Sequence, residues 1–144
     1  ISGDEIILKE DLKNNIIDSL KISNNSFIVE KDTIGKKNNF NQIKGIKLDG
    51  KIIDNKLDKI KIDQNAELIY YMYNDENILI GIDKAISSSI LMYFKDGKID
   101  EILFQNQPEG VLYQEENLDE NQKKLLGFVD RFSERITKTK NFTY

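Results

Sequence analysis

The chain has 144 residues, with 21 Lys and Arg against 25 Asp and Glu, so its formal net charge is −4. This length suits one domain with a hydrophobic core, and the weakly acidic charge disfavours nucleic acid as a partner. The sequence contains no cysteine and no histidine, which excludes disulfides, thiolate or imidazole metal sites and the usual nucleophile and base pairs of hydrolases. Carboxylates, Lys, Tyr and hydroxyls remain as possible catalysts, but no carboxylate pair is placed by the sequence in a way that demands opposed pKa values. An enzyme is therefore the least favoured interpretation, and we predict a protein that is not an enzyme and that has no cofactor and no metal site.

One pattern of apolar residues occurs three times, in copies that begin at Ile1, Ile43 and Ala85. The equivalent residues Ile6, Leu48 and Ile90 follow one another at equal intervals of 42 residues (6 to 48 and 48 to 90). Such a period is typical of stacked repeats, in which each unit buries its apolar face against its neighbours. We expect residues 1–116 to form one repeat domain. Because the chain begins directly on a repeat, we also expect it to be a piece of a longer protein.

Each copy is predicted to form an antiparallel β-hairpin. A dipeptide that tolerates the positive φ angles of a tight turn occurs in each copy, at Asn14-Asn15, Asp54-Asn55 and Asp96-Gly97. In the strand after each turn, apolar residues alternate with polar ones, as at Ile60 and Ile62, which places the apolar side chains on one face. These strands are expected to be separated from further apolar strands by polar links, at Asn24-Asn25, Gln64-Asn65 and Asn106-Gln107.

The C-terminal part departs from the repeat pattern. Between about residues 119 and 136 the apolar residues recur at helical spacing, at Leu125, Phe128, Val129, Phe132 and Ile136. Asp119 or Asn117 could serve as the N-cap of such a helix. For residues 117–144 we predict a short helix and an irregular tail that pack over one end of the sheet and cover an edge.

The stretch from Phe40 to Phe104 contains the runs Asn65-Ala66-Glu67, Ile69-Tyr70-Tyr71 and Gly81-Ile82-Asp83-Lys84-Ala85. With these runs, and with similarity over nearly the whole chain, the sequence resembles the OstA-like proteins of Bacteroidetes-type bacteria, relatives of the lipopolysaccharide-transport protein LptA. It departs from that family near its end, where Gln114 and Ile136 stand in place of the usual prolines. The resemblance implies an all-β fold, an open β-jellyroll of repeated antiparallel hairpins with two facing sheets and an apolar interior.

The resemblance also implies a function. It predicts a non-enzymatic periplasmic module that shields the acyl chains of lipopolysaccharide on their way to the outer membrane. The expected partners are lipopolysaccharide or another acylated lipid, and other Lpt-type β-jellyroll proteins that pair with it through sheet edges. An association with the inner or outer membrane would then arise through those partners.

Alignment of the copies predicts three ladders of apolar residues: Ile6 with Leu48 and Ile90, Leu20 with Ile60 and Ile102, and Ile22 with Ile62 and Phe104. From residues alone, such a stripe is more often a closed core than a groove. The family resemblance favours a groove, in which acyl chains gain ~0.8 kcal/mol per buried methylene. The predicted lining consists of Ile6, Leu8, Leu20, Ile22, Leu48, Ile60, Ile62, Ile69, Ile90, Met92, Phe94, Ile102, Phe104 and Val111.

Two other features have less specific explanations. Asp18, Asp58 and Asp100 recur at equivalent positions, and they could form a carboxylate row, but each follows a turn and a turn or solvent-facing role is favoured. The tyrosines around residues 70–73 could stack on a ligand, but strand alternation would split them between two faces, which favours packing. A second function also remains open, namely a structural or protein-interaction β-repeat that pairs through its edges without binding lipid.

Overall fold

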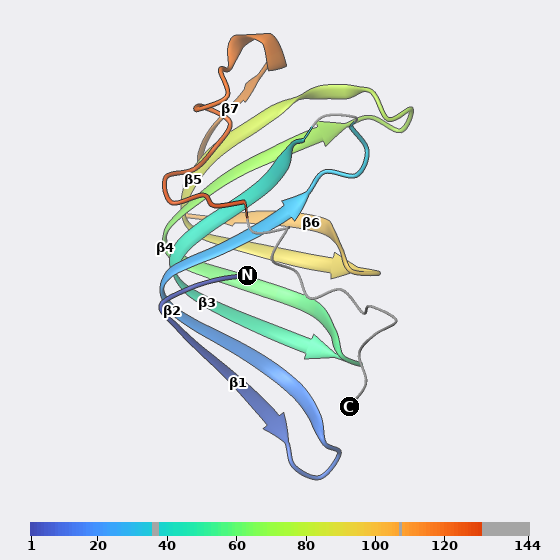
Figure 1. Cartoon of the computed structure of the whole chain (residues 1–144), viewed down its shortest axis with the longest axis vertical. Coiled ribbons are helices and arrows are strands. Elements are labelled where there is room, and N and C mark those ends of the chain that lie inside the picture. Colours follow the sequence, from blue (N-terminus) through green and yellow to red (C-terminus); the bar gives the residue numbers. More distant parts are fainter. Residues whose placement is uncertain (36–37, 107, 131–144) are drawn as a thin grey trace, which may run out of the picture.

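The computed structural model describes residues 1–35, 38–106 and 108–130, and these residues form an all-β structure (Figure 1). The only helical element in this part of the chain is the 3-10 helix η1 (Glu115–Asn117). The sequence prediction of an all-β fold of antiparallel hairpins is confirmed. The strands are β1 (Glu5–Asp11), β2 (Ile16–Lys31), β3 (Phe40–Ile53), β4 (Lys56–Tyr73), β5 (Leu79–Lys95), β6 (Lys98–Gln105) and β7 (Glu109–Tyr113).

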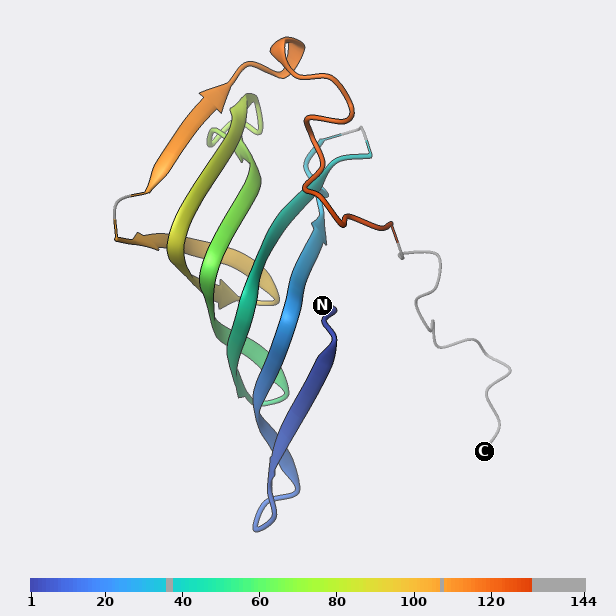
Figure 2. The same ribbon diagram turned by 90° about the vertical axis from the view of Figure 1, so that its left-hand side faces the viewer.

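The strands form one open sheet in the order β1-β2-β3-β4-β5-β6, and each pairs antiparallel with the next along the chain. β7 pairs with β5 on a different stretch of that strand from the stretch that β6 occupies. The sheet is bent across its middle, so that two halves face each other like the sides of a V (Figure 1). Figure 2, viewed from the side of the bend, shows the strands side by side from β1 to β6.

We call the half that contains β1 and β6 the lower half and the half that contains β7 the upper half, as they stand in Figure 1. β2, β3, β4 and β5 run through both halves. β1 and β6 stand at the two ends of the strand order, and within the described residues neither has a second neighbour. The sheet is therefore open and jellyroll-like, as predicted.

The bend lies where the pairing register shifts in the middle of the long strands. The shifts fall between Ser23 and Ser26 on β2, and between Asp63 and Ala66 on β4. At these points the backbone is left-handed, with φ of 58° and 50° at Asn24 and Asn25, and 67° and 52° at Gln64 and Asn65. Two successive left-handed residues interrupt the ladder and turn the strand. For Asn24-Asn25 and Gln64-Asn65 the predicted link between separate strands is thus wrong, because these dipeptides are bulges inside continuous strands. Asn106 does lie between two strands, β6 and β7, as predicted, and Gln107 lies outside the described residues.

The left-handed conformation of Gln64 makes the bend testable. We expect Gln64→Val to lower the free energy of unfolding by about 1–2 kcal/mol, because a β-branched side chain is strained at positive φ. Gln64→Gly, the matched control, should leave stability equal or higher, since glycine adopts this conformation without strain. Urea unfolding of the three proteins measures both effects. Equal stability of the valine and glycine variants would show that the bend does not depend on this backbone conformation.

Among the described residues, two hydrophobic clusters hold the fold together. The first lies between the two halves on the inner face of the sheet, and it includes Ile22, Ile62 and Leu68. The second lies on the outer face of the upper half, where Phe27, Ile69, Tyr71 and Ile82 pack with Leu118 and Leu125. The chain after β7 therefore crosses the outside of the upper half, as the path of this segment in Figure 2 also shows.

The predicted C-terminal helix is absent from the described residues up to 130. Asp119 and Gln122 do make a reciprocal capping pair, from Asp119 N to Gln122 Oε1 at 2.9 Å and from Gln122 N to Asp119 Oδ1 at 2.8 Å. This pair closes a turn, but the chain then continues irregularly and Gly127 has a φ of 92°. The segment covers a face of the sheet instead of an end or an edge, which corrects that prediction. Phe132 and Ile136 lie outside the described residues.

Candidate functional site

The inner face of the lower half carries two rows of side chains that run across all six strands of the main strand order. Residues opposite each other in an antiparallel pair share a face, so the strand register defines each row. The first row consists of Ile6, Ile22, Leu48, Ile62, Ile90 and Phe104. The second row consists of Leu8, Leu20, Gly50, Ile60, Met92 and Ile102. The predicted ladders are confirmed, and the first and third of them join into one row.

Burial changes along these rows. Ile60, Ile62 and Ile90 in the middle strands are 0% exposed. At one edge, in contrast, Ile6 and Leu8 are 49% and 55% exposed. In the first row the halves touch near the bend, where a Cβ added to Gly45 would stand only 2.3 Å from Ile62 Cγ2. The stripe is thus a closed core in its centre.

Around this core lies a rim of half-buried apolar side chains that pack against it. We call the apolar inner face of the lower half the trough. The residues of its rim, which we call the trough rim, are Ile52, Leu57, Phe94, Ile99, Ile102 and Phe104. They come from the turn-proximal parts of β3, β4 and β5 and from β6. The sequence predicted Phe94, Ile102 and Phe104 as lining residues. Ile52, Leu57 and Ile99 were missed, although they flank the predicted turns at Asp54-Asn55 and Asp96-Gly97.

Two predicted lining residues lie on the other face. Ile69 belongs to the outer cluster beneath the C-terminal segment. Val111 is 53% exposed and stands opposite Lys84, which in turn stands opposite Ile69, so Val111 shares the outer face. Both predictions are wrong. The alternation of β4 contained the necessary signal, because Leu68 belongs to the inner cluster and its neighbour Ile69 must therefore point outward.

The inner face of the upper half changes from apolar to polar with distance from the bend. Nearest the bend, one row consists of Ile28, Ile43, Leu68 and Ala85. The next inner positions toward the free ends of these strands are polar, at Glu30, Asn41, Tyr70 and Asp83. The apolar inner face of the upper half thus ends in these four polar residues, which we call the polar mouth.

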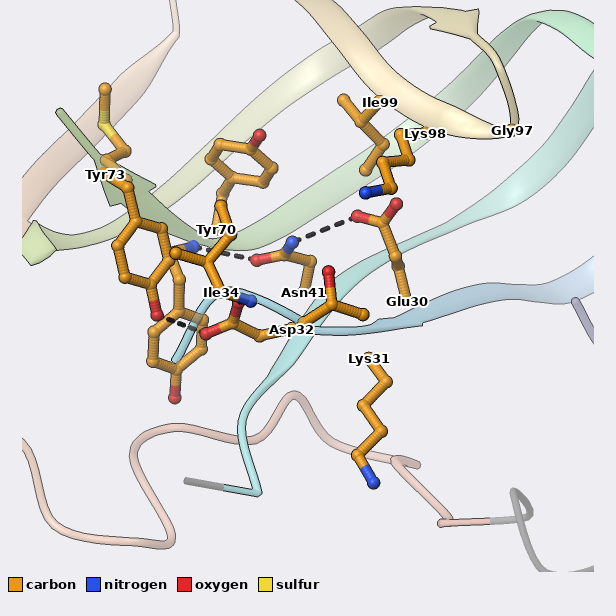
Figure 3. Close-up of a pocket in the computed structure, with 13 residues that line it drawn as sticks. Glu30, Lys31, Asp32, Ile34, Asn41, Tyr70, Tyr73, Gly97, Lys98 and Ile99 are labelled. Carbon is orange, nitrogen blue, oxygen red and sulfur yellow. Dashed lines mark hydrogen bonds between the residues drawn. The ribbon is translucent and has the colours of Figure 1, made fainter. Parts of the chain in front are cut away.

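A pocket of about 540 Å³ opens at this mouth (Figure 3). Asn41 organises its wall, because Tyr71 N donates to Asn41 Oδ1 at 2.8 Å and Asn41 Nδ2 donates to Glu30 Oε2 at 3.1 Å. Asp32 Oδ1 accepts from the backbone N–H groups of Ile34 at 2.9 Å and Gly35 at 3.3 Å.

The tyrosines around this mouth are divided between the two faces, as alternation predicted: Tyr70 packs against the inner cluster, and Tyr71 and Tyr73 belong to the outer one. Burial raises the pKa of Tyr70, and the charges of Glu30 and Asp32 add to the effect. Burial also raises the pKa of Tyr73, whose hydroxyl donates to Asp32 Oδ2. These hydroxyls are therefore protonated at neutral pH.

Burial raises the pKa of Tyr71 from 10.0 to about 12, and the charges of Glu120 and Glu115 add to this. Between these two pH values the unfolded chain loses the Tyr71 proton and the folded chain keeps it, so stability falls as pH rises. We expect the free energy of unfolding to decline over this window, and Tyr71→Phe to decline less steeply. Urea unfolding at a series of pH values measures both slopes. Equal slopes would show that Tyr71 does not titrate differently in the two states.

The recurring aspartates do not gather into a site. Asp18 and Asp100 are exposed and Asp58 is half-buried. Across residues 1–35, 38–106 and 108–130, no group of three or more His, Cys, Asp or Glu side chains is placed to hold a metal ion. None of the helices in those same ranges is long and apolar enough to cross a membrane.

No protein-family model matches this chain, and no significant match was found among curated proteins or solved structures.

Proposed function

We propose that this protein is a non-enzymatic carrier that shields the acyl chains of a lipid, such as lipopolysaccharide, between the two halves of its open sheet. The observation that supports the proposal is the apolar inner face itself. Its rows run without a charged residue across six strands, and at their β6 end they consist of half-buried side chains, Phe104 and Ile102. The part of this face that stays accessible, at Ile6, Leu8 and the half-buried trough rim, is an apolar surface of the kind typical of a binding site.

The energetics favour a chain-like ligand over a compact one. The centre of the rows is already closed, with Ile60 and Ile62 fully buried. A ligand must therefore lie along the trough rim and against the exposed Ile6 and Leu8. An acyl chain that buries about six methylenes there gains about 5 kcal/mol. This gain is large enough to hold one acyl chain. Each further chain that buries methylenes in the trough would add to the binding free energy in proportion to their number.

The periplasmic location and lipopolysaccharide as the cargo are parts of the same proposal, and the family resemblance of the sequence supports them. The proposed protein partners are β-jellyroll proteins of the same kind, paired edge to edge. β1 and β6 are the ends of the strand order, and Ile6, Ile7 and Leu8 on β1 are all more than 40% exposed, at 49%, 43% and 55%. Unpaired edges of this kind can accept a strand from another chain.

These open edges favour the second candidate function, a structural or interaction repeat that pairs through its edges and carries no lipid. Native mass spectrometry separates the two functions in one experiment, since it reports bound lipid and oligomeric state together. We expect the protein, purified from cells that make lipopolysaccharide, to retain adducts with the mass of an acylated lipid. Lipid-free oligomers after lipid has been supplied would favour the structural repeat. Lipid-free monomers would contradict both functions.

A further inference from the structure

The pocket at the polar mouth and the apolar trough share walls. The pocket lies between the free end of the upper half and the β5–β6 hairpin, which contributes Gly97 of the turn and Lys98 and Ile99 at the start of β6 (Figure 3). Tyr70 and Ile99 line the pocket and also pack against the inner cluster. One amphiphilic molecule could therefore occupy both places, with its chain in the trough and its polar head in the pocket.

The polar groups of the pocket differ in how many partners they already have. Asp32 accepts two backbone N–H groups and the Tyr73 hydroxyl, and both polar atoms of the Asn41 amide are used. Glu30 uses only Oε2. Among the described residues, Glu30 Oε1, the Tyr70 hydroxyl and the Lys98 ammonium have no hydrogen-bond partner. The pocket thus presents an acceptor, a hydroxyl and a donor to a ligand.

The other walls of the pocket are apolar. Ile34, Met72 and Ile99 line it together with the aromatic ring of Tyr70. A sugar ring has the matching surface, because its hydroxyls both donate and accept hydrogen bonds while its C–H faces pack on apolar and aromatic groups. The volume of about 540 Å³ also lies in the range of small-molecule sites.

The charged side chains at the mouth of the pocket favour an uncharged sugar over a phosphate as the ligand. Glu30 and Asp32 line the pocket, and Asp83 stands beside Tyr70 on the same inner face. Lys98 points toward Glu30, whereas Lys31 points away from the pocket (Figure 3). Two lining carboxylates, with Asp83 nearby on the same face, thus stand against one inward-pointing ammonium group, and an anionic head would meet net repulsion.

We propose that this pocket binds an uncharged sugar of an acylated glycolipid whose chains lie in the trough. This inference rests on the proposed function, because the chain must lie in the trough for its head to reach the pocket. It narrows the cargo to lipids whose head presents a sugar without phosphate at this end of the molecule.

The test compares three amphiphiles that have the same ten-carbon chain: decyl maltoside, decyl dimethylamine oxide and decyl phosphate. Each is titrated into the protein by calorimetry below its critical micelle concentration. We expect the maltoside to bind about tenfold more tightly than the amine oxide, the equivalent of one good hydrogen bond, and decyl phosphate to bind most weakly. Tyr70→Phe should remove most of the preference for maltoside and leave binding of the amine oxide unchanged. Glu30→Gln should strengthen binding of decyl phosphate.

Tyr93→Phe is the matched control, because Tyr93 lies on the outer face, where it pairs with Lys59. It should leave all three affinities unchanged. Equal binding of the three amphiphiles, or a maltoside preference that persists in both pocket variants, would overturn the sugar pocket and leave the carrier function standing. Failure of the folded protein to bind any of the three would overturn both proposals.

Discussion

Ile102→Asp is expected to weaken lipid binding at least about tenfold, whereas Leu103→Asp, one residue further along β6, should leave it unchanged. Ile102 is half-buried in the trough rim, and Leu103 is 41% exposed on the outer face. A carboxylate placed against hydrocarbon has no partner and is strongly disfavoured. Aspartate is the better choice than lysine, because the long lysine side chain could reach solvent while its methylenes still cover the trough.

The pair of variants is matched in residue type, strand and distance from the edge, so loss of strand propensity affects both equally. Native mass spectrometry of lipid adducts measures the effect, and circular dichroism checks that both variants fold. Photocrosslinking gives an independent measurement, with a photoreactive residue at Ile102 or Phe104 on the rim and at Lys59 or Lys61 on the outer face as controls. Equal adducts in the two aspartate variants, or equal crosslinking from both faces, would contradict a trough that binds lipid.

The sequence predicted the parts of the fold that depend on local pattern. Asp54-Asn55 and Asp96-Gly97 form the expected turns, because these dipeptides adopt left-handed backbone cheaply, with φ of 50°, 60°, 51° and 77°. The apolar rows followed from strand alternation and from the 42-residue repeat, which brought Ile6, Leu48 and Ile90 into one row.

The bend and the burial along the rows could not be predicted in the same way. The turn at Asp54-Asn55 and the bulge at Gln64-Asn65 have similar residue types and both have left-handed backbone. One ends a strand and the other only bends it, because the chain beyond Gln64 finds a partner in β3 again at Glu67, Leu68 and Ile69. That pairing is a tertiary event. Whether the apolar stripe closes or opens likewise depends on the angle between the halves, on which a periodic pattern carries no information.

The C-terminal segment shows the same limit most clearly. Its helical spacing is real, and its capping pair at Asp119 forms, yet contacts distant in sequence decide its path. Gln42 is 2% exposed on the outer face of β3 and accounts for two of these contacts. Its Nε2 donates to Lys123 O at 2.8 Å, and its Oε1 accepts from Leu125 N at 2.8 Å. A glutamine in a strand gives no indication that it will bind backbone more than eighty residues away.

Gln42→Leu is therefore expected to lower the free energy of unfolding by about 3 kcal/mol. Leucine has a similar volume and keeps the site apolar, but it leaves Leu125 N and Lys123 O buried without their partner, which costs about 1–3 kcal/mol for each group. The C-terminal segment should also detach more often from the outer cluster, so that the Leu125 amide exchanges its hydrogen faster.

Urea unfolding measures the loss of stability, and hydrogen exchange measures the detachment. Gln105→Leu is the matched control, because Gln105 is exposed at the end of β6, where a surface substitution should change stability by no more than about 0.5 kcal/mol. If Gln42→Leu matched this control in stability, with unchanged exchange at Leu125, the segment would be held by the apolar contacts of Leu118, Leu125 and Phe128 alone. Faster exchange with unchanged global stability would instead show that the segment opens independently of the sheet.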